Sequence, residues 1–212
     1  MCSVSLARDG ETLAVYTPDT LNDHMTGITD HIHRVCTEAG VVMGDLQAVT
    51  ISAGPGSYTG LRIGTSAAKG ICHALGIPLI TIPTPEAMVS AMLEKYRGQD
   101  VLFCPLIDAR RMEVYTMLAD TDGTILLPPF AYIVTSPAFD YVPAGKPCVY
   151  FGSGLEKCLD HLPAGAVADR DYTPSAEHLH SLANRQYSKG IFADMPYFEP
   201  LYLKDFYTPI KK

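Results

Sequence analysis

A glycine-rich segment in the first third of the chain carries the residues best suited to chemistry. It reads Ser52-Ala-Gly-Pro-Gly-Ser-Tyr-Thr-Gly-Leu-Arg-Ile-Gly64 and joins an apolar run to an expected helix. Glycines let the backbone approach a ligand closely, the serine and the threonine can cap the helix, and free N–H groups at a helix start attract anions. The segment therefore predicts a phosphate or carboxylate site. The residues expected to form it are Gly54, Gly56, Ser57, Thr59 and Gly60.

The spacing of these glycines matches neither of the two common phosphate-binding motifs. The Gly-x-Gly-x-x-x-Gly pattern is one residue too long for a dinucleotide fingerprint, and no Gly-Lys-Ser/Thr follows that would make a P-loop. A structural role stays equally open. In that case the segment is a tight turn from strand to helix, with the helix packed closely at Gly60 and Gly64.

The sequence contains none of the common motifs of hydrolytic enzymes, and its paired histidines are badly spaced for a metal site. It contains no Gly-x-Ser-x-Gly and no His-Glu-x-x-His, and no histidine is near Ser57 in the sequence. His31 and His33 are two residues apart on an expected helix, so they point in different directions, and His178 and His180 share this spacing. We therefore predict neither a catalytic residue nor a metal site in this chain.

Hydrophobic patterning predicts strands and helices that alternate around the glycine-rich segment. The turn Asp9-Gly10 lies between two short runs of strand type, so the chain opens with a hairpin. Apolar residues at helical spacing predict three helices. These helices span residues 22–39, 59–75 and 85–96. Short continuous apolar runs predict buried parallel strands. These strands span residues 46–53 and 79–82.

A break in composition at Arg97-Gly98-Gln99-Asp100 divides the chain. We place a lobe boundary there, with residues 1–98 in a first lobe and residues 99–212 in a second, smaller lobe. Apolar runs predict four strands in the second lobe, and these span residues 101–107, 113–119, 125–130 and 149–151. A last long helix is expected at residues 175–189. The fold class that follows is α/β.

The composition excludes several classes of protein. Only 18% of the residues are charged, 47% are hydrophobic, and the formal net charge is -7. A negative chain is a poor primary platform for nucleic acid, because such binding rests largely on neutralising phosphates. No segment approaches the roughly 20 apolar residues of a membrane-spanning helix, and the N-terminus lacks the pattern of a secretion signal. We therefore expect a cytoplasmic protein whose six cysteines are reduced.

Three segments resemble the bacterial TsaB (YeaZ) family. The stretch from Gly54 to Gly64, read with Lys69-Gly70, is similar to the family's signature. Residues 105–115 resemble the opening of the family's second lobe, and residues 199–204 resemble its C-terminal end. The resemblance implies an actin-like (ASKHA, ribonuclease H-like) fold of two related α/β lobes, shared with the catalytic paralogue TsaD.

The same resemblance implies a scaffold function rather than catalysis. TsaB proteins pair with TsaD, which the ATPase TsaE joins, to form threonylcarbamoyladenosine in tRNA. TsaD-like proteins carry His-Met-x-Gly-His as metal ligands, whereas this chain has His24-Met25-Thr26-Gly27-Ile28, so the second ligand position is isoleucine. We expect a homodimer when the chain is alone and contact with tRNA only through partners. No cofactor is required by this chain, although ATP or ADP at the partner interface stays open.

The resemblance also implies that two helices of the first lobe form the partner surface. Apolar and small side chains recur on one stripe of each helix, which suits close packing between helices. The expected interface residues are His24, Ile28, Ile32, Leu61, Thr65 and Ala68. A second interpretation stays open, in which these stripes face the chain's own sheet.

Two further expectations concern the N-terminus and Asp108. Members of the family begin with a strand that has no counterpart before Cys2-Ser3-Val4-Ser5-Leu6, so we expect this strand to be missing and the true start to lie upstream of Met1. An alternative function is that of an ATP-dependent actin-fold enzyme, such as a small-molecule kinase or an ATPase. Asp108 is the residue that would serve it, because its carboxylate could hold magnesium. A salt-bridged corner at residues 108–111 is an equally good interpretation.

Overall fold

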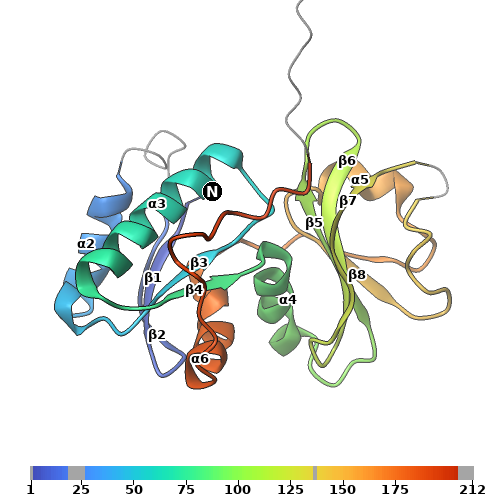
Figure 1. The fold of residues 1–212 in the computed structure, drawn as a ribbon. Coiled ribbons are helices and arrows are strands. Elements are labelled where there is room, and N and C mark those ends of the chain that lie inside the picture. Colours follow the sequence, from blue (N-terminus) through green and yellow to red (C-terminus); the bar gives the residue numbers. More distant parts are fainter. Residues whose placement is uncertain (1, 19–26, 136–137, 205–212) are drawn as a thin grey trace, which may run out of the picture.

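The computed structural model describes residues 2–18, 27–135 and 138–204, which form two α/β lobes on either side of helix α4 (Thr84–Lys95) (Figure 1). The strands within these residues lie in three sheets. Those of the first lobe are β1 (Val4–Arg8), β2 (Glu11–Tyr16), β3 (Val49–Ser52) and β4 (Leu79–Ile82). Those of the second lobe are β5 (Leu102–Asp108), β6 (Glu113–Asp120), β7 (Ile125–Ile133), β8 (Cys148–Phe151) and β9 (Val167–Asp169).

The chain opens with the predicted hairpin. β1 and β2 pair antiparallel, and the turn residues Asp9 and Gly10 have positive φ angles of 54° and 89°. Two successive positive φ angles are what a two-residue hairpin turn requires, which is why Asp-Gly is favoured there. Helix α2 (Ile28–Glu38) packs on this hairpin, where the ring of buried His31 contacts that of Tyr16.

A second, parallel pair of strands separates two layers of helices. β3 pairs with β4, helix α3 (Tyr58–Leu75) follows β3, and helix α6 (His180–Ser188) packs against β4. Because side chains alternate along a strand, Leu79 packs with Cys72 of α3, whereas Ile80 packs on the other side with Leu182 of α6. Helices α3 and α6 therefore cover opposite faces of this pair.

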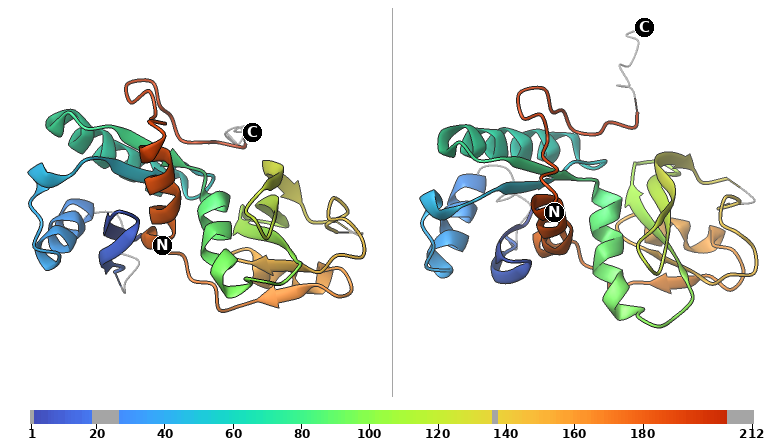
Figure 2. Two further views of the ribbon diagram at one scale, coloured as in Figure 1. Left: turned by 90° about the horizontal axis from the view of Figure 1, so that it is seen from below. Right: turned by 60° about the horizontal axis from the view of Figure 1, so that its bottom comes forward.

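The predicted second lobe, residues 99–212, is too long. The short 3-10 helix η3 (Ala176–Leu179), helix α6 and the segment that follows return to the first lobe (Figure 2). Leu179 packs with Ile80 in one core cluster, and Phe198 packs with Cys72 in another. The assignment of residues 176–198 to the second lobe was wrong, because apolar periodicity identifies a buried face without showing which sheet covers it.

The second lobe is a mixed sheet of order β7-β6-β5-β8-β9 with a core on each face. Phe103 and Phe151 point to one face, where Met88 of α4 covers them. Leu106 and Tyr150 point to the other face and pack with Phe139. The four predicted strands are present, and β7 continues through two prolines, as an edge strand tolerates. β9 was not predicted, because three residues carry too little pattern.

The outer edges of β1 and β3 are unpaired within the described part of the chain. The two sheets of the first lobe contain only β1-β2 and β3-β4. All four residues of β3 are half-buried, whereas three of the four residues in β4 are fully buried. The expectation of a further strand upstream of Met1 stays a prediction.

His180 fastens the N-terminal hairpin to helix α6. Its Nε2 lies 2.7 Å from the hydroxyl of Ser5, and its Nδ1 lies 3.0 Å from the hydroxyl of Thr12. Burial lowers the pKa of His180, an effect that the nearby carboxylate of Glu177 opposes and the neighbouring His178 reinforces. The folded state therefore favours the neutral imidazole ring, in which one nitrogen donates a hydrogen bond and the other accepts one.

This arrangement predicts an acid-sensitive contribution to stability. Because the folded-state pKa of His180 lies below its ordinary value of 6.5, the unfolded chain binds the proton more readily. The contribution is complete above pH 6.5 and is lost as the pH falls from there towards the folded-state pKa. Urea unfolding at several pH values should show that the stability difference between the parent chain and His180→Asn shrinks on acidification. A difference that does not change with pH would contradict this role.

Candidate functional site

The glycine loop, residues 53–57, is positioned by a strand before it and a helix after it. β3 ends at Ser52, and α3 begins at Tyr58. Ser57 is the N-cap residue, and its hydroxyl accepts a hydrogen bond from the amide of Gly60 at 3.4 Å. Ser57 therefore caps the helix as predicted, whereas Thr59 is an exposed residue of its first turn.

The packing of the chain around residue 54 requires a glycine there. Its φ angle is +95°, and a Cβ atom placed there would lie 2.9 Å from the carbonyl oxygen of Leu201 and 3.0 Å from Cδ1 of Leu61. No side chain fits that space without displacing the backbone. By contrast, a Cβ on Gly56 or Gly64 would meet no atom of the other described residues within 4 Å, apart from chain neighbours and the local helix backbone. The structural interpretation thus explains Gly54, and anion binding at the rest of the loop stays a prediction.

Residues 199–204, here termed the C-terminal strap, lie against the glycine loop. The amide of Leu201 donates to the carbonyl of Ala53 at 2.7 Å. The ring centroid of Tyr202 lies 5.3 Å from that of Tyr58 at the start of α3. The guanidinium of Arg62 lies over the ring of Tyr58, 4.0 Å from its centroid. The strap therefore fixes the junction between β3 and α3.

Asp108 ends β5 at the corresponding turn of the second lobe. Its carboxylate accepts a hydrogen bond from the amide of Arg110 at 2.9 Å and forms an ion pair with Lys157. Lys157 also donates to the carbonyls of Arg111 at 2.9 Å and Glu113 at 2.6 Å. Desolvation by burial alone would raise the pKa of Asp108, but the bonds from Lys157 and from the Arg110 amide outweigh it and lower that pKa.

The salt-bridged corner is thus what the structure contains at residues 108–111. Arg110 and Arg111 have positive φ angles of 66° and 50°, an uncommon conformation for residues with a side chain. The carbonyl of Arg111 is held by Lys157, which supports this turn. A role of Asp108 towards magnesium or a nucleotide stays a prediction.

The strap brings the glycine loop and the Asp108 turn into one assembly. After its contacts with the first lobe, the strap runs on to the second lobe (Figure 1), which it contacts through Lys204. The ammonium of Lys204 donates to the carbonyl of Ala109 at 3.3 Å, pairs with the carboxylate of Glu113, and lies 5.8 Å from the ring centroid of Tyr115. The predicted phosphate-binding loop and the Asp108 turn are therefore both in contact with the C-terminal strap.

Two residues of the expected partner surface face inwards. Thr65 and Ala68 are only 8% and 3% exposed, and Ala68 packs with Cys72 and Leu79. We correct their assignment, because a buried side chain cannot meet a partner. Leu61, Ile28 and Ile32 are half-buried, and His24 lies outside the described residues. The outward side of α3 instead presents Arg62, Ser66, Gly70 and His73.

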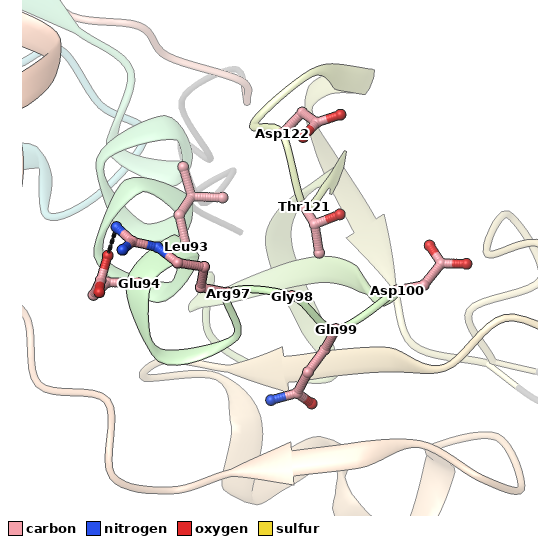
Figure 3. Close-up of a pocket in the computed structure, with 8 residues that line it drawn as sticks. All are labelled: Leu93, Glu94, Arg97, Gly98, Gln99, Asp100, Thr121 and Asp122. Carbon is pink, nitrogen blue, oxygen red and sulfur yellow. Dashed lines mark hydrogen bonds and ion pairs between the residues drawn. The ribbon is translucent and has the colours of Figure 1, made fainter.

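Two hollows of the surface are lined by residues outside the glycine loop. One has a volume of about 420 Å³ and lies between the end of α4 and the turn that joins β6 to β7 (Figure 3). Arg97 pairs with Glu94 on its α4 side, while Asp100 and Asp122 point away from that helix. Among the residues described, no three His, Cys, Asp or Glu side chains are placed to hold a metal ion. We therefore assign no chemistry to this hollow.

A second hollow, of about 500 Å³, lies between α4 and residues 171–178. Its cation, Lys95, is already paired with Asp169 at 2.7 Å and with Asp171 at 3.3 Å. Tyr96 also donates to Asp169 at 2.8 Å, and burial is the main reason why the pKa of Tyr96 rises to about 12. These groups join α4 to the chain leaving β9.

Sequence reasoning missed Lys157 and Lys204, the two cations on which the Asp108 turn depends. Neither lies near that turn in the sequence, and a single lysine in a sequence indicates only a solvated side chain. The one available signal was the resemblance of residues 199–204 to the family's C-terminal end, which marks the segment without giving the contact.

The five-stranded mixed sheet of the second lobe, together with the similarity to the solved structures below, defines an actin-like, ribonuclease H-like α/β protein. Two solved structures from Pseudomonas aeruginosa are similar throughout. One, described as similar to the peptidase YeaZ, has a TM-score of 0.81 and 26% identity over 96% of this chain and 94% of that chain. The other, YeaZ itself, has a TM-score of 0.78 and 25% identity over 95% and 94%.

The family model "TsaD: tRNA N6-adenosine threonylcarbamoyltransferase" matches residues 17–140. The tRNA threonylcarbamoyladenosine biosynthesis protein TsaB of Escherichia coli (strain K12) is 27% identical over 96% of this chain and 90% of its own length. TsaB of Bacillus subtilis (strain 168) is 31% identical over 54% of this chain. That match spans about half the length of the B. subtilis protein, 48%. The chain belongs to the TsaB (YeaZ) family.

One further property concerns membranes. Of the helices in the described residues, none combines the length and the apolar character that crossing a bilayer demands.

The contact at Gly54 predicts a sharp difference between two glycines of the same signature. Gly54→Ala should destabilise the protein by about 2 kcal/mol or more, because the new methyl group meets the Leu201 carbonyl at a positive φ. Gly64→Ala should stabilise it by about 0.5–1 kcal/mol, since Gly64 is inside a helix with open space beside it. Urea unfolding of both variants checks this. Equal effects would show that Gly54 is not held by the strap.

Proposed function

We propose that this chain is a non-catalytic scaffold partner of TsaD, acting with TsaE in the formation of threonylcarbamoyladenosine in tRNA. The names of its relatives support a role in this biosynthesis. The observation that carries the scaffold role is the state of the two segments expected to bind a nucleotide, the glycine loop through phosphate and Asp108 through magnesium. Gly54 is closed by Leu201 and Asp108 is engaged by Lys157, so both serve the chain's own structure.

The outward side of α3 is the surface that suits a partner helix. Gly70 and Ser66 are exposed there, and a Cβ placed on Gly70 would have no described atom within 4 Å beyond its own stretch of helix. Small residues let two helix axes approach to about 8 Å. Arg62 and His73 flank them, and α3 contains no acidic residue, so an acidic helix face of the partner would be complementary.

The other proposals follow from the same role. The exposed side of α3 would also allow a two-fold homodimer in the absence of TsaD, because a two-fold contact uses one patch twice. A net charge of -7 favours contact with tRNA through the partners. We propose a cytoplasmic location, no cofactor of the chain's own, and any ATP or ADP at the partner interface.

The decisive experiment is reconstitution with TsaD and TsaE from the same organism. Modified tRNA should form only when this chain is added, and the purified chain alone should not hydrolyse ATP. ATP hydrolysis by the chain alone that is lost in Asp108→Asn would favour the alternative, an ATP-dependent actin-fold enzyme.

The proposed surface predicts a loss of pairing without a loss of folding. Ser66→Arg combined with Gly70→Glu places two charges in the expected helix contact, which should weaken binding to TsaD at least about a hundredfold. Both positions are exposed, so the melting temperature of the isolated chain should stay near that of the parent. Co-purification and titration calorimetry measure the binding.

A matched control is available on the opposite face of the β3-β4 pair. Ser188→Arg adds one charge to an exposed position of α6 and should leave pairing unchanged. Undiminished pairing of the double variant, or an equal loss in the control, would remove α3 as the interface.

A further inference from the structure

The two lobes are joined covalently at two places. One is α4, which leads from β4 into β5, and the other is the segment 170–175, which leads from β9 back to η3. At the C-terminal end of α4, Lys95 and Tyr96 bind Asp169 and so tie these two crossovers together. Two adjacent crossovers are the arrangement about which one lobe can rotate against the other.

The C-terminal strap joins the lobes at the other end of α4. The glycine loop that it contacts is bonded to the first residue of α4, since the amide of Thr84 donates to the carbonyl of Gly54 at 2.9 Å. Thr84 and Lys95 begin and end this helix, a separation of about 17 Å at 1.5 Å per residue. A tie at this distance from the crossovers resists rotation about them.

The strap's contact with the second lobe depends on one cation. Lys204 is 32% exposed at its side chain and Glu113 is 20% exposed, so their ion pair is partly shielded from water. Lys204 also donates to the Ala109 carbonyl and lies beside the ring of Tyr115. Charge-assisted bonds that are shielded in this way are stronger than those on an open surface.

We propose that the C-terminal strap is an interlobe latch, in which Lys204 holds the second lobe against the first and its release lets the Gly54 loop and the Asp108 turn move apart. While the latch is closed, the two lobes move as one body. Any ligand that needs space between the two turns must displace the strap first. The latch is independent of which partner the chain binds.

The amide of Leu201 reports on this latch, because its hydrogen bond to Ala53 holds the strap in place. In Lys204→Met the aliphatic stem is kept and the charge is removed. Hydrogen exchange at Leu201 should become about tenfold faster, as expected for the loss of a charge-assisted bond. Glu113→Gln should give an acceleration of the same kind. Small-angle scattering of either variant should show a larger radius of gyration than that of the parent.

Lys146→Met is the matched control. Lys146 is 34% exposed and pairs with Asp100, but both residues belong to the second lobe. Its loss should leave exchange at Leu201 unchanged. If Lys204→Met does not fold, the parent chain at high salt gives the same test, since ionic strength weakens a partly exposed pair. Parent-like exchange at Leu201 in Lys204→Met, or salt-independent exchange in the parent, would overturn the latch.

Discussion

The close approach of Leu201 to Gly54 constrains the whole arrangement of this protein. The carbonyl oxygen of the strap occupies the space where any side chain at residue 54 would begin, and the neighbouring amide bonds to Ala53. That contact sets the direction in which the chain leaves β3 and enters α3. It also carries the strap towards the second lobe, where Lys204 reaches the turn after Asp108. The packing of the C-terminal residues on the first lobe therefore decides how the two lobes are joined.

The proposed function follows from what the glycine loop and the carboxylate of Asp108 bind within the chain. A glycine loop before a helix is suited to phosphate, and a carboxylate at the end of a strand is suited to magnesium. Here Gly54 of the loop is closed by a backbone carbonyl, and the carboxylate of Asp108 is bound to Lys157. The surface that we propose for a partner is the outward side of α3, with small residues between Arg62 and His73. A scaffold needs such a face and a fixed shape behind it.

Much of the fold could be predicted from local chemistry, whereas the long-range contacts could not. Asp9-Gly10 predicted the hairpin because few residues tolerate positive φ, and Ser57 predicted a helix start because its hydroxyl satisfies a free amide. The inward orientation of Thr65 could not be predicted, since small residues suit a partner helix and a sheet equally. The contact of Lys204 with Glu113 was hidden because only the tertiary structure brings them together.

We have proposed that this chain works by docking through α3 while its own strap keeps the lobes closed. A cryo-EM or crystal structure of the chain bound to TsaD tests it most directly. The account predicts that the α3 surface around Ser66 and Gly70 is buried by a helix of TsaD, with Leu201 still bonded to Ala53. A complex in which α3 remains exposed and the second lobe carries the contact would contradict it.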